Sequence, residues 1–100
     1  MSTKAPIILA VDTSDLELAK AWIAHTCEYV QVFKLGLEFF LNFGAQGVRA
    51  ITENSDVKIF LDLKLHDIPN TVAHAASSAA LLKPLFLTVH ASGGSEMIKA

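Results

Sequence analysis

The chain has 100 residues, of which 52% are hydrophobic and 18% are charged, and its formal net charge is −2. This length fits one small domain, and the absence of any cluster of Lys and Arg argues against nucleic acid as a partner. The single cysteine, Cys27, excludes an internal disulfide. No apolar stretch approaches the roughly 18 residues that span a bilayer, and no signal-peptide pattern precedes the first apolar run. We therefore expect a cytoplasmic protein with no membrane partner.

Short apolar runs alternate with longer amphipathic stretches along the chain. In chain order the pattern predicts a strand at 7–11, a helix at 14–27, a strand at 30–35, a helical stretch at 37–53, a strand at 56–63, a helix from 69 to about 83, a strand at 85–90 and a helix starting near 93. Ser14 and Glu17 have the spacing of a capping box. Gly44 interrupts the second helical stretch, and Pro69 suits a first helical turn. The Lys83–Pro84 pair is a stop signal.

Four strands that alternate with helices predict an α/β fold made of parallel βαβ units. The regular spacing of the strands, with short connections, favours a (β/α) barrel, although a doubly wound sheet is an alternative on the pattern alone. Residues 11–14, at the end of the first strand, contain no glycine, so the Gly-rich dinucleotide fingerprint is absent there.

Charged residues gather where the predicted strands end. Asp62 and Lys64 alternate with Leu residues in one strand, so both side chains lie on one face of it. An ion pair within an apolar strand costs desolvation free energy that packing alone does not require. Asp12 ends the first strand, Lys34 lies near the end of the second, and Asp67 follows the third. Because parallel strands carry their functional face at their carboxyl ends, these five residues predict a site.

Four segments of the chain, Val11–Asp12, Phe33–Gly36, Asp62–Thr71 and Val89–Ala91, closely resemble the orotidine 5'-phosphate decarboxylase family. The Asp-x-Lys-x-x-Asp core alone occurs in a wider suprafamily of barrel enzymes that act on phosphorylated sugars, whereas the extension through Ile68–Thr71 is the specific part. The resemblance implies a (β/α)8 barrel of the TIM type. Residues 1–100 are then expected to be roughly its first four βα units, the N-terminal half of a single domain.

The resemblance implies removal of carbon dioxide from orotidine 5'-phosphate to give uridine 5'-phosphate, with no metal and no organic cofactor. Lys64 would stabilise the developing carbanion and protonate it, and Asp62 would lie near the substrate carboxylate. Lys34 would keep Asp62 ionised and contact the ribose. Asp12 would hydrogen-bond a ribose hydroxyl.

The resemblance also implies a homodimer with shared active sites. The residue equivalent to Asp67 reaches into the neighbouring subunit's site, with Ile68 and Thr71 beside it. The family's phosphate-binding residues come from later units of the barrel, so we expect the 100-residue chain alone to be inactive and prone to association.

Three other functions remain as alternatives. A magnesium-dependent phosphosugar decarboxylase or synthase of the same suprafamily would share Asp62, Lys64 and Asp67. A barrel aldolase would use Lys64 as a Schiff-base lysine. A half-barrel without activity would serve as a binding or assembly module. His90 is expected to be structural, and residues 92–95 are expected to form a turn rather than a phosphate site.

Overall fold

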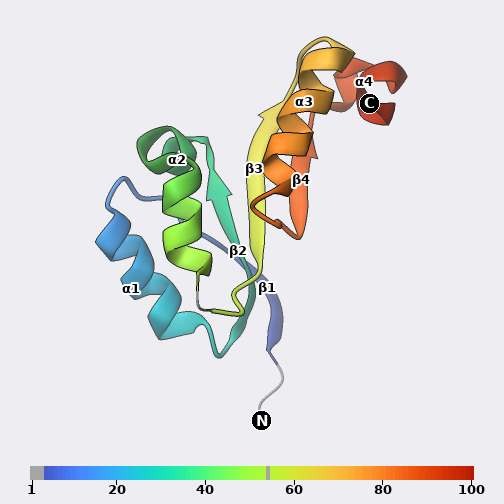
Figure 1. Ribbon diagram of the computed structural model, residues 1–100. Coiled ribbons are helices and arrows are strands. Elements are labelled where there is room, and N and C mark those ends of the chain that lie inside the picture. The colour runs from blue at the N-terminus through green and yellow to red at the C-terminus, as the bar shows by residue number, and fades with distance from the viewer. Residues whose placement is uncertain (1–3, 54) are drawn as a thin grey trace.

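The computed structural model describes residues 4–53 and 55–100, in which strands and helices alternate (Figure 1). The elements are β1 (Ala5–Ala10), α1 (Leu16–Thr26), β2 (Val30–Gly36), α2 (Leu37–Thr52), β3 (Ile59–Leu65), α3 (Pro69–Ala80), β4 (Phe86–Val89), the short 3₁₀ helix η1 (Ala91–Gly93) and α4 (Ser95–Lys99). The four strands form one parallel sheet in the order β1-β2-β3-β4.

The strand order distinguishes the two architectures that the sequence pattern allows. A doubly wound sheet reverses its strand order at a switch point, whereas a (β/α)8 barrel places each new strand beside the one before it. Here every strand pairs with its predecessor in the chain. The predicted barrel is therefore confirmed, and the elements described are the first βα units of a (β/α)8 barrel.

The hydrophobic core lies between the sheet and the helices. On β2 the side chains of Phe33 and Leu35 are buried in this core, and on β3 Ile59 and Leu61 are buried in it too. The helices contribute Ala19, Ile23, Phe39, Val48, Ile51 and Ala79. Because side chains alternate along a strand, the residues between these positions point to the opposite face, which becomes the interior of a barrel. The charged residues of β2 and β3 lie on that inner face.

The helix signals in the sequence are confirmed at two points and wrong at two others. Gly44 interrupts α2 with φ 62° and ψ −159°, and α3 begins at Pro69. The N-cap of α1 is Asp15 instead of Ser14, because the Asp15 carboxylate accepts the backbone N–H of Leu18 at 3.1 Å. The third helix ends at Ala80, three residues before the predicted stop, because a turn follows it at once.

The predicted strands are shifted at their ends. The third strand is Ile59–Leu65 instead of 56–63, and it contains both Asp62 and Lys64, as their alternation with Leu residues predicted. The first strand ends at Ala10, which places Asp12 in the loop before α1. Within residues 4–53 and 55–100, no helix combines the length and the apolar character needed to cross a membrane.

Candidate active site

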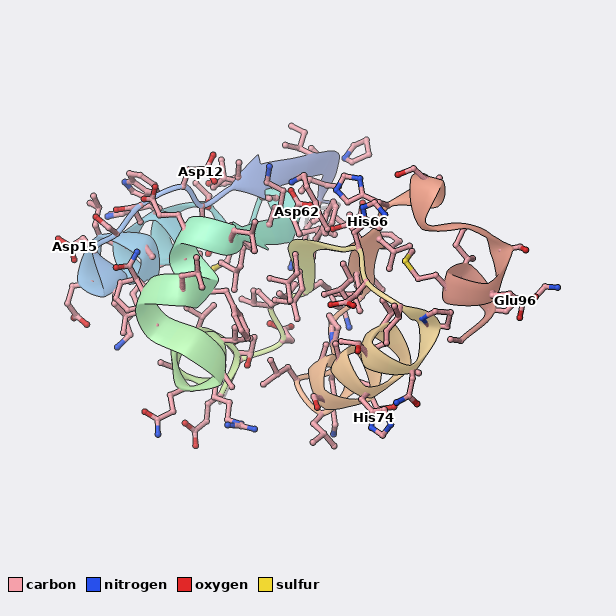
Figure 2. The ribbon with its side chains drawn as sticks, turned by 90° about the horizontal axis from the view of Figure 1, so that it is seen from above. Asp12, Asp15, Asp62, His66, His74 and Glu96 are labelled. Atoms are coloured by element: carbon pink, nitrogen blue, oxygen red, sulfur yellow. The ribbon has the colours of Figure 1, made fainter. Side chains whose placement is uncertain are left out.

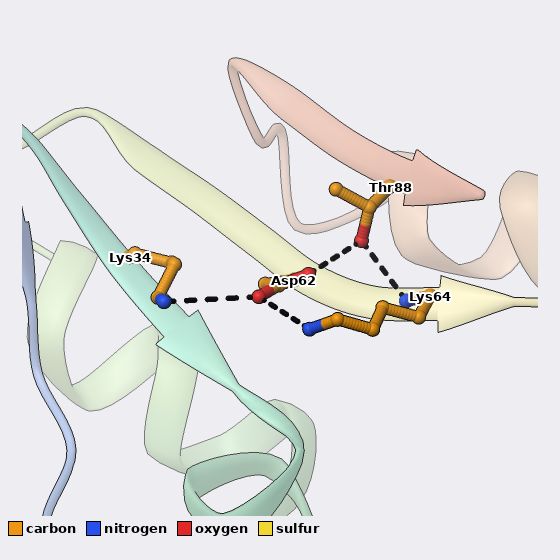
Figure 3. Close-up of polar contacts among 4 residues, drawn as sticks. All are labelled: Lys34, Asp62, Lys64 and Thr88. Atoms are coloured by element: carbon orange, nitrogen blue, oxygen red, sulfur yellow. Dashed lines mark hydrogen bonds and ion pairs between the residues drawn. The ribbon is translucent and has the colours of Figure 1, made fainter. Parts of the chain in front are cut away.

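Asp62 lies at the centre of a row of charges on the inner face of the sheet (Figure 3). Its Oδ2 atom is 2.7 Å from the Nζ atom of Lys64 and 3.8 Å from the Nζ atom of Lys34. The side chain of Asp62 is 12% exposed, whereas that of Lys64 is 53% exposed. A buried carboxylate is thus held between two ammonium groups, one of which is open to solvent.

The strand register explains why these three side chains meet. In the pairing of β2 with β3, Lys34 lies opposite Phe60, and Gly36 lies opposite Asp62. Lys34 is therefore diagonal to Asp62 on the same face, within reach of a long side chain. Lys64 follows Asp62 at the i+2 position and points to that face as well. The prediction that Asp62 and Lys64 share a face is confirmed by their hydrogen bond.

The backbone at Lys64 leaves the regular strand geometry. Lys64 has φ 52°, in the left-handed region that residues other than glycine seldom occupy. In the pairing of β3 with β4, Leu61 lies opposite Leu87 and Leu65 opposite Val89, so β3 advances four residues while β4 advances two. Such a conformation costs on the order of 1–3 kcal/mol and persists only where neighbouring contacts hold it.

Thr88 provides one of those contacts and was not predicted from the sequence. Its hydroxyl accepts the backbone N–H of Lys64 at 2.9 Å and donates to the Oδ1 atom of Asp62 at 2.8 Å (Figure 3). The available signal was a polar residue within the apolar run of the fourth strand, at a position that alternates with Phe86. The register shift that brings Thr88 to Lys64 left no signal in the sequence.

The contacts of Asp62 lower its pKa below the ordinary value. The largest cause is the hydrogen bond from Lys64, and burial acts in the opposite direction by penalising the charged form. The hydrogen bond from Thr88 and the positive charges of Lys64 and Lys34 lower the pKa further. Asp62 is therefore a carboxylate at neutral pH.

The other predicted site residues lie apart from this row. Figure 2 shows Asp62 near the middle of the sheet, with Asp12 toward the α1 side of the molecule. Asp67 accepts the backbone N–H of Ile68 at 2.7 Å through its own Oδ1 atom. Among the residues that the structure describes, no ion pair joins Asp12 or Asp67 to Lys34 or Lys64.

Asp67 and its neighbours instead form a separate exposed surface. Ile68 is 65% exposed, and Thr71 is exposed on the first turn of α3. Beside them is an open cavity of about 500 Å³, lined by His66, Asp67, Ile68, Pro69, Ser92 and Gly93. A second cavity of about 240 Å³ extends from Lys64 past Asp67 to Thr71. This surface adjoins the row of charges without contributing to it.

The residues that follow β4 contribute little to the charged row. The His90 ring lies 5.2 Å from that of His66, between centroids, and the His90 backbone N–H donates to the Leu65 carbonyl at 3.0 Å. Residues 91–93 form the 3₁₀ helix η1, which overlaps the turn expected at residues 92–95. In the described part of the chain no three His, Cys, Asp or Glu side chains are grouped closely enough to bind a metal ion.

Comparison with known proteins gives the family. The model of the orotidine 5'-phosphate decarboxylase / HUMPS family matches residues 5–100. An orotidine 5'-phosphate decarboxylase of Thermobifida fusca is 50% identical over 96 residues, which are 96% of this chain and 41% of the relative. The chain thus spans about two fifths of the length of the curated relatives it matches.

Two solved structures share the fold. The orotidine 5'-phosphate decarboxylase of Lactobacillus acidophilus is 41% identical with a TM-score of 0.81, over 94% of this chain and 42% of that one. The orotidine 5'-monophosphate decarboxylase of Methanocaldococcus jannaschii, complexed with the inhibitor BMP, is 25% identical with a TM-score of 0.85, over 97% and 45%. From the family match, the sequence identity and the shared fold together, this chain belongs to the orotidine 5'-phosphate decarboxylase / HUMPS family.

Proposed function

We propose that this chain supplies catalytic groups of a decarboxylase that converts orotidine 5'-phosphate to uridine 5'-phosphate and carbon dioxide in pyrimidine biosynthesis. The observation that carries the proposal is the buried carboxylate of Asp62, held between the ammonium groups of Lys34 and Lys64. It lies where adjacent parallel strands end, the usual place for catalysis in barrels. The names of the matched relatives support the same reaction, and the inhibitor-bound structure supports a small-molecule ligand.

Lys64 has the proton and the position that this reaction needs. When the bond between C6 of the pyrimidine and the carboxylate carbon breaks, its electron pair stays on C6 and carbon dioxide leaves. The half-exposed ammonium of Lys64 stabilises that pair and then transfers a proton from Nζ to C6. The lysine regains its proton from water. Attraction between unit charges about 4 Å apart at an effective dielectric constant of 20 is roughly 4 kcal/mol, so binding of the phosphate and ribose must supply the rest.

Asp62 and Lys34 prepare the site for that step. Asp62 is an anion beside the position proposed for the substrate carboxylate, and their repulsion is relieved as carbon dioxide leaves. Lys34 balances the charge of Asp62 from the β2 side and is long enough to contact the ribose as well. Asp12, exposed after β1, is proposed to bind a ribose hydroxyl.

The contacts of Asp62 and Lys64 favour this reaction over the two enzymatic alternatives. Both carboxylate oxygens of Asp62 already accept hydrogen bonds, Oδ1 from Thr88 and Oδ2 from Lys64. In a magnesium enzyme these oxygens would also have to bind the cation, which the positive Lys64 ammonium 2.7 Å from Oδ2 would repel. A Schiff-base enzyme needs a neutral amine, whereas the Lys64 amine donates to a carboxylate as an ammonium.

The test is release of carbon dioxide from carboxyl-labelled orotidine 5'-phosphate by the complete barrel that carries this chain. We expect turnover to survive exhaustive chelation with EDTA. No release of carbon dioxide would contradict the proposed reaction. Release that stops on chelation and returns with magnesium would favour the magnesium-dependent alternative.

We also propose that the complete protein is a homodimer with shared active sites. Asp67, Ile68 and Thr71 are exposed, adjoin the cavity of about 500 Å³ or the smaller one next to it, and make no ion pair with the lysines of their own chain within the described residues. A surface of this kind next to a catalytic row is suited to completing the site of a second copy. Residues 1–100 would then form half of one barrel domain in each subunit.

A further inference from the structure

We propose that Thr88 is a positioning residue of this site: its hydroxyl fixes the Asp62 carboxylate and the Lys64 backbone together, and so aims the Lys64 ammonium. The proposal rests on the proposed decarboxylase function for its kinetic consequence only. Its structural basis is one hydroxyl that bonds both the anion and the strained residue of the row.

The register shift between β3 and β4 creates the need for this hydroxyl. In a regular parallel pair, backbone carbonyls accept the backbone N–H groups of the neighbouring strand. At Lys64 the pairing is interrupted, and its N–H donates at 2.9 Å to the side chain of Thr88 instead. Thr88 therefore replaces a lost ladder bond at a strand residue with a left-handed backbone.

The direction of the two hydrogen bonds fixes the carboxylate. A threonine hydroxyl has one proton to donate and two lone pairs to accept with. Since the N–H of Lys64 occupies a lone pair, the hydroxyl proton is free to donate to Oδ1 of Asp62 at 2.8 Å. Oδ2 accepts from Nζ of Lys64 at 2.7 Å. Donors on both oxygens prevent the carboxylate from rotating, so the ammonium has one fixed acceptor.

Loss of the Thr88 hydroxyl would affect Lys64 in two ways. The backbone N–H of Lys64 would lose its acceptor, and the Asp62 carboxylate, which orients the Lys64 ammonium, would lose one of its two donors. The charged groups facing Asp62 are Lys34 from β2 and Lys64 on β3, while β4 presents Thr88. With both lysines still in place, removing the hydroxyl would raise the pKa of Asp62 toward its ordinary value.

The kinetic test compares Thr88→Val, which keeps the shape without the hydroxyl, with Thr88→Ser, which keeps the hydroxyl, in the complete barrel. For Thr88→Val we expect kcat to fall about 10- to 100-fold, the range for losing a hydrogen bond to a charged group, with KM changed less than about 3-fold. Thr88→Ser should stay within about 3-fold of the parent in kcat, because it keeps the same bonds. Thr88→Ala checks that any loss comes from the hydroxyl and not from the valine methyl group.

A second readout does not need turnover. The titration of the Asp62 carboxyl can be followed by NMR of ¹³C-labelled aspartate and assigned with Asp62→Asn. Its midpoint should lie at higher pH in Thr88→Val and Thr88→Ala than in the parent protein, and at the parental pH in Thr88→Ser. Unchanged titration, or equal kcat in the valine and serine variants, would overturn the positioning role. Absence of carbon dioxide release by the parent protein would overturn the proposed function alone, since the titration still tests Thr88.

Discussion

At the scale of single residues, the row Lys34–Asp62–Lys64, on which the proposed function rests, contributes little to stability. Lys64 is half exposed, and ion pairs open to solvent contribute at most about 1 kcal/mol. Lys34 is nearly 4 Å from Asp62, so its contribution is long-range attraction without a hydrogen bond. Asp62 itself is buried and would be costly without its partners. The arrangement keeps one anion ionised and one ammonium accessible.

The lowered pKa of Asp62 predicts how the row responds to acid. Because the folded pKa lies below the ordinary value of about 3.9, the stabilisation is fully present above that value and is lost as the pH falls through the folded pKa. Between pH 6 and pH 2, the free energy of unfolding measured with urea should fall by about 0.2–1 kcal/mol more in the parent protein than in Asp62→Asn. Asp56→Asn, which removes an exposed carboxylate outside the row, is the control. Equal acid sensitivity in the parent and Asp62→Asn would contradict the ion pairing.

The sequence predicted which side chains lie together wherever strand alternation alone determines the face on which they lie. The i and i+2 positions of Asp62 and Lys64 give their common face, and Lys34 joins them because neighbouring strands stay in register up to that point. Thr88 was missed because its contacts depend on a register shift. Asp67 was grouped with the lysines because it follows the third strand. It lines a cavity together with Lys64 but makes no ion pair with Lys34 or Lys64 among the residues described, so its role in the site stays a prediction.

At the scale of elements, β3 and its two connections position the site. The order of strands and helices follows from the apolar pattern, and the break at Gly44 follows from glycine itself. The exact ends of the helices and strands do not follow from this pattern, because neighbouring residues can each cap or end a helix within one to three positions. The N-cap of α1 at Asp15 and the end of α3 at Ala80 are examples.

Gly44 offers a test at the element scale. Its φ of 62° with ψ of −159° belongs to a region that is essentially restricted to glycine. We expect Gly44→Ala to lower the free energy of unfolding by about 1–3 kcal/mol, measured as a shift of the urea midpoint at constant slope. Gly36→Ala is the matched control, because Gly36 has φ −95° and open space where a Cβ would lie. A Gly44→Ala variant as stable as the control would contradict the kink.

At the scale of the whole molecule, the inner face of the sheet is polar at its carboxyl end and apolar below. Phe60 and Phe86 pack edge to face there with ring centroids 5.8 Å apart, and Phe86 is 51% exposed. Ile8 on β1 is 48% exposed on the other margin of the sheet. In a closed barrel such side chains are covered by the remaining strands. Only the family resemblance, and not the apolar pattern, predicted these exposed side chains on the inner face.

The proposal that two subunits share their active sites makes a prediction for mixed dimers. Asp67→Ala and Lys64→Ala homodimers should both be nearly inactive. In a mixed dimer one site combines an intact Lys64 with an intact Asp67 from the other subunit, so turnover should return when the two proteins are unfolded and refolded together. The same proteins refolded separately and then combined are the control. If verified mixed dimers show no recovery, each site is formed within one subunit.

The most direct measurement is the rate of carbon dioxide release by Lys64→Ala in the complete barrel at saturating orotidine 5'-phosphate. We expect a loss of about 10²- to 10⁴-fold, the range for removing a positioned proton donor, with the affinity for uridine 5'-phosphate largely retained. Lys20→Ala, which removes an exposed lysine paired with Glu17 on α1, should release carbon dioxide at the parental rate. Parental turnover in Lys64→Ala would contradict the role of this ammonium as the proton donor.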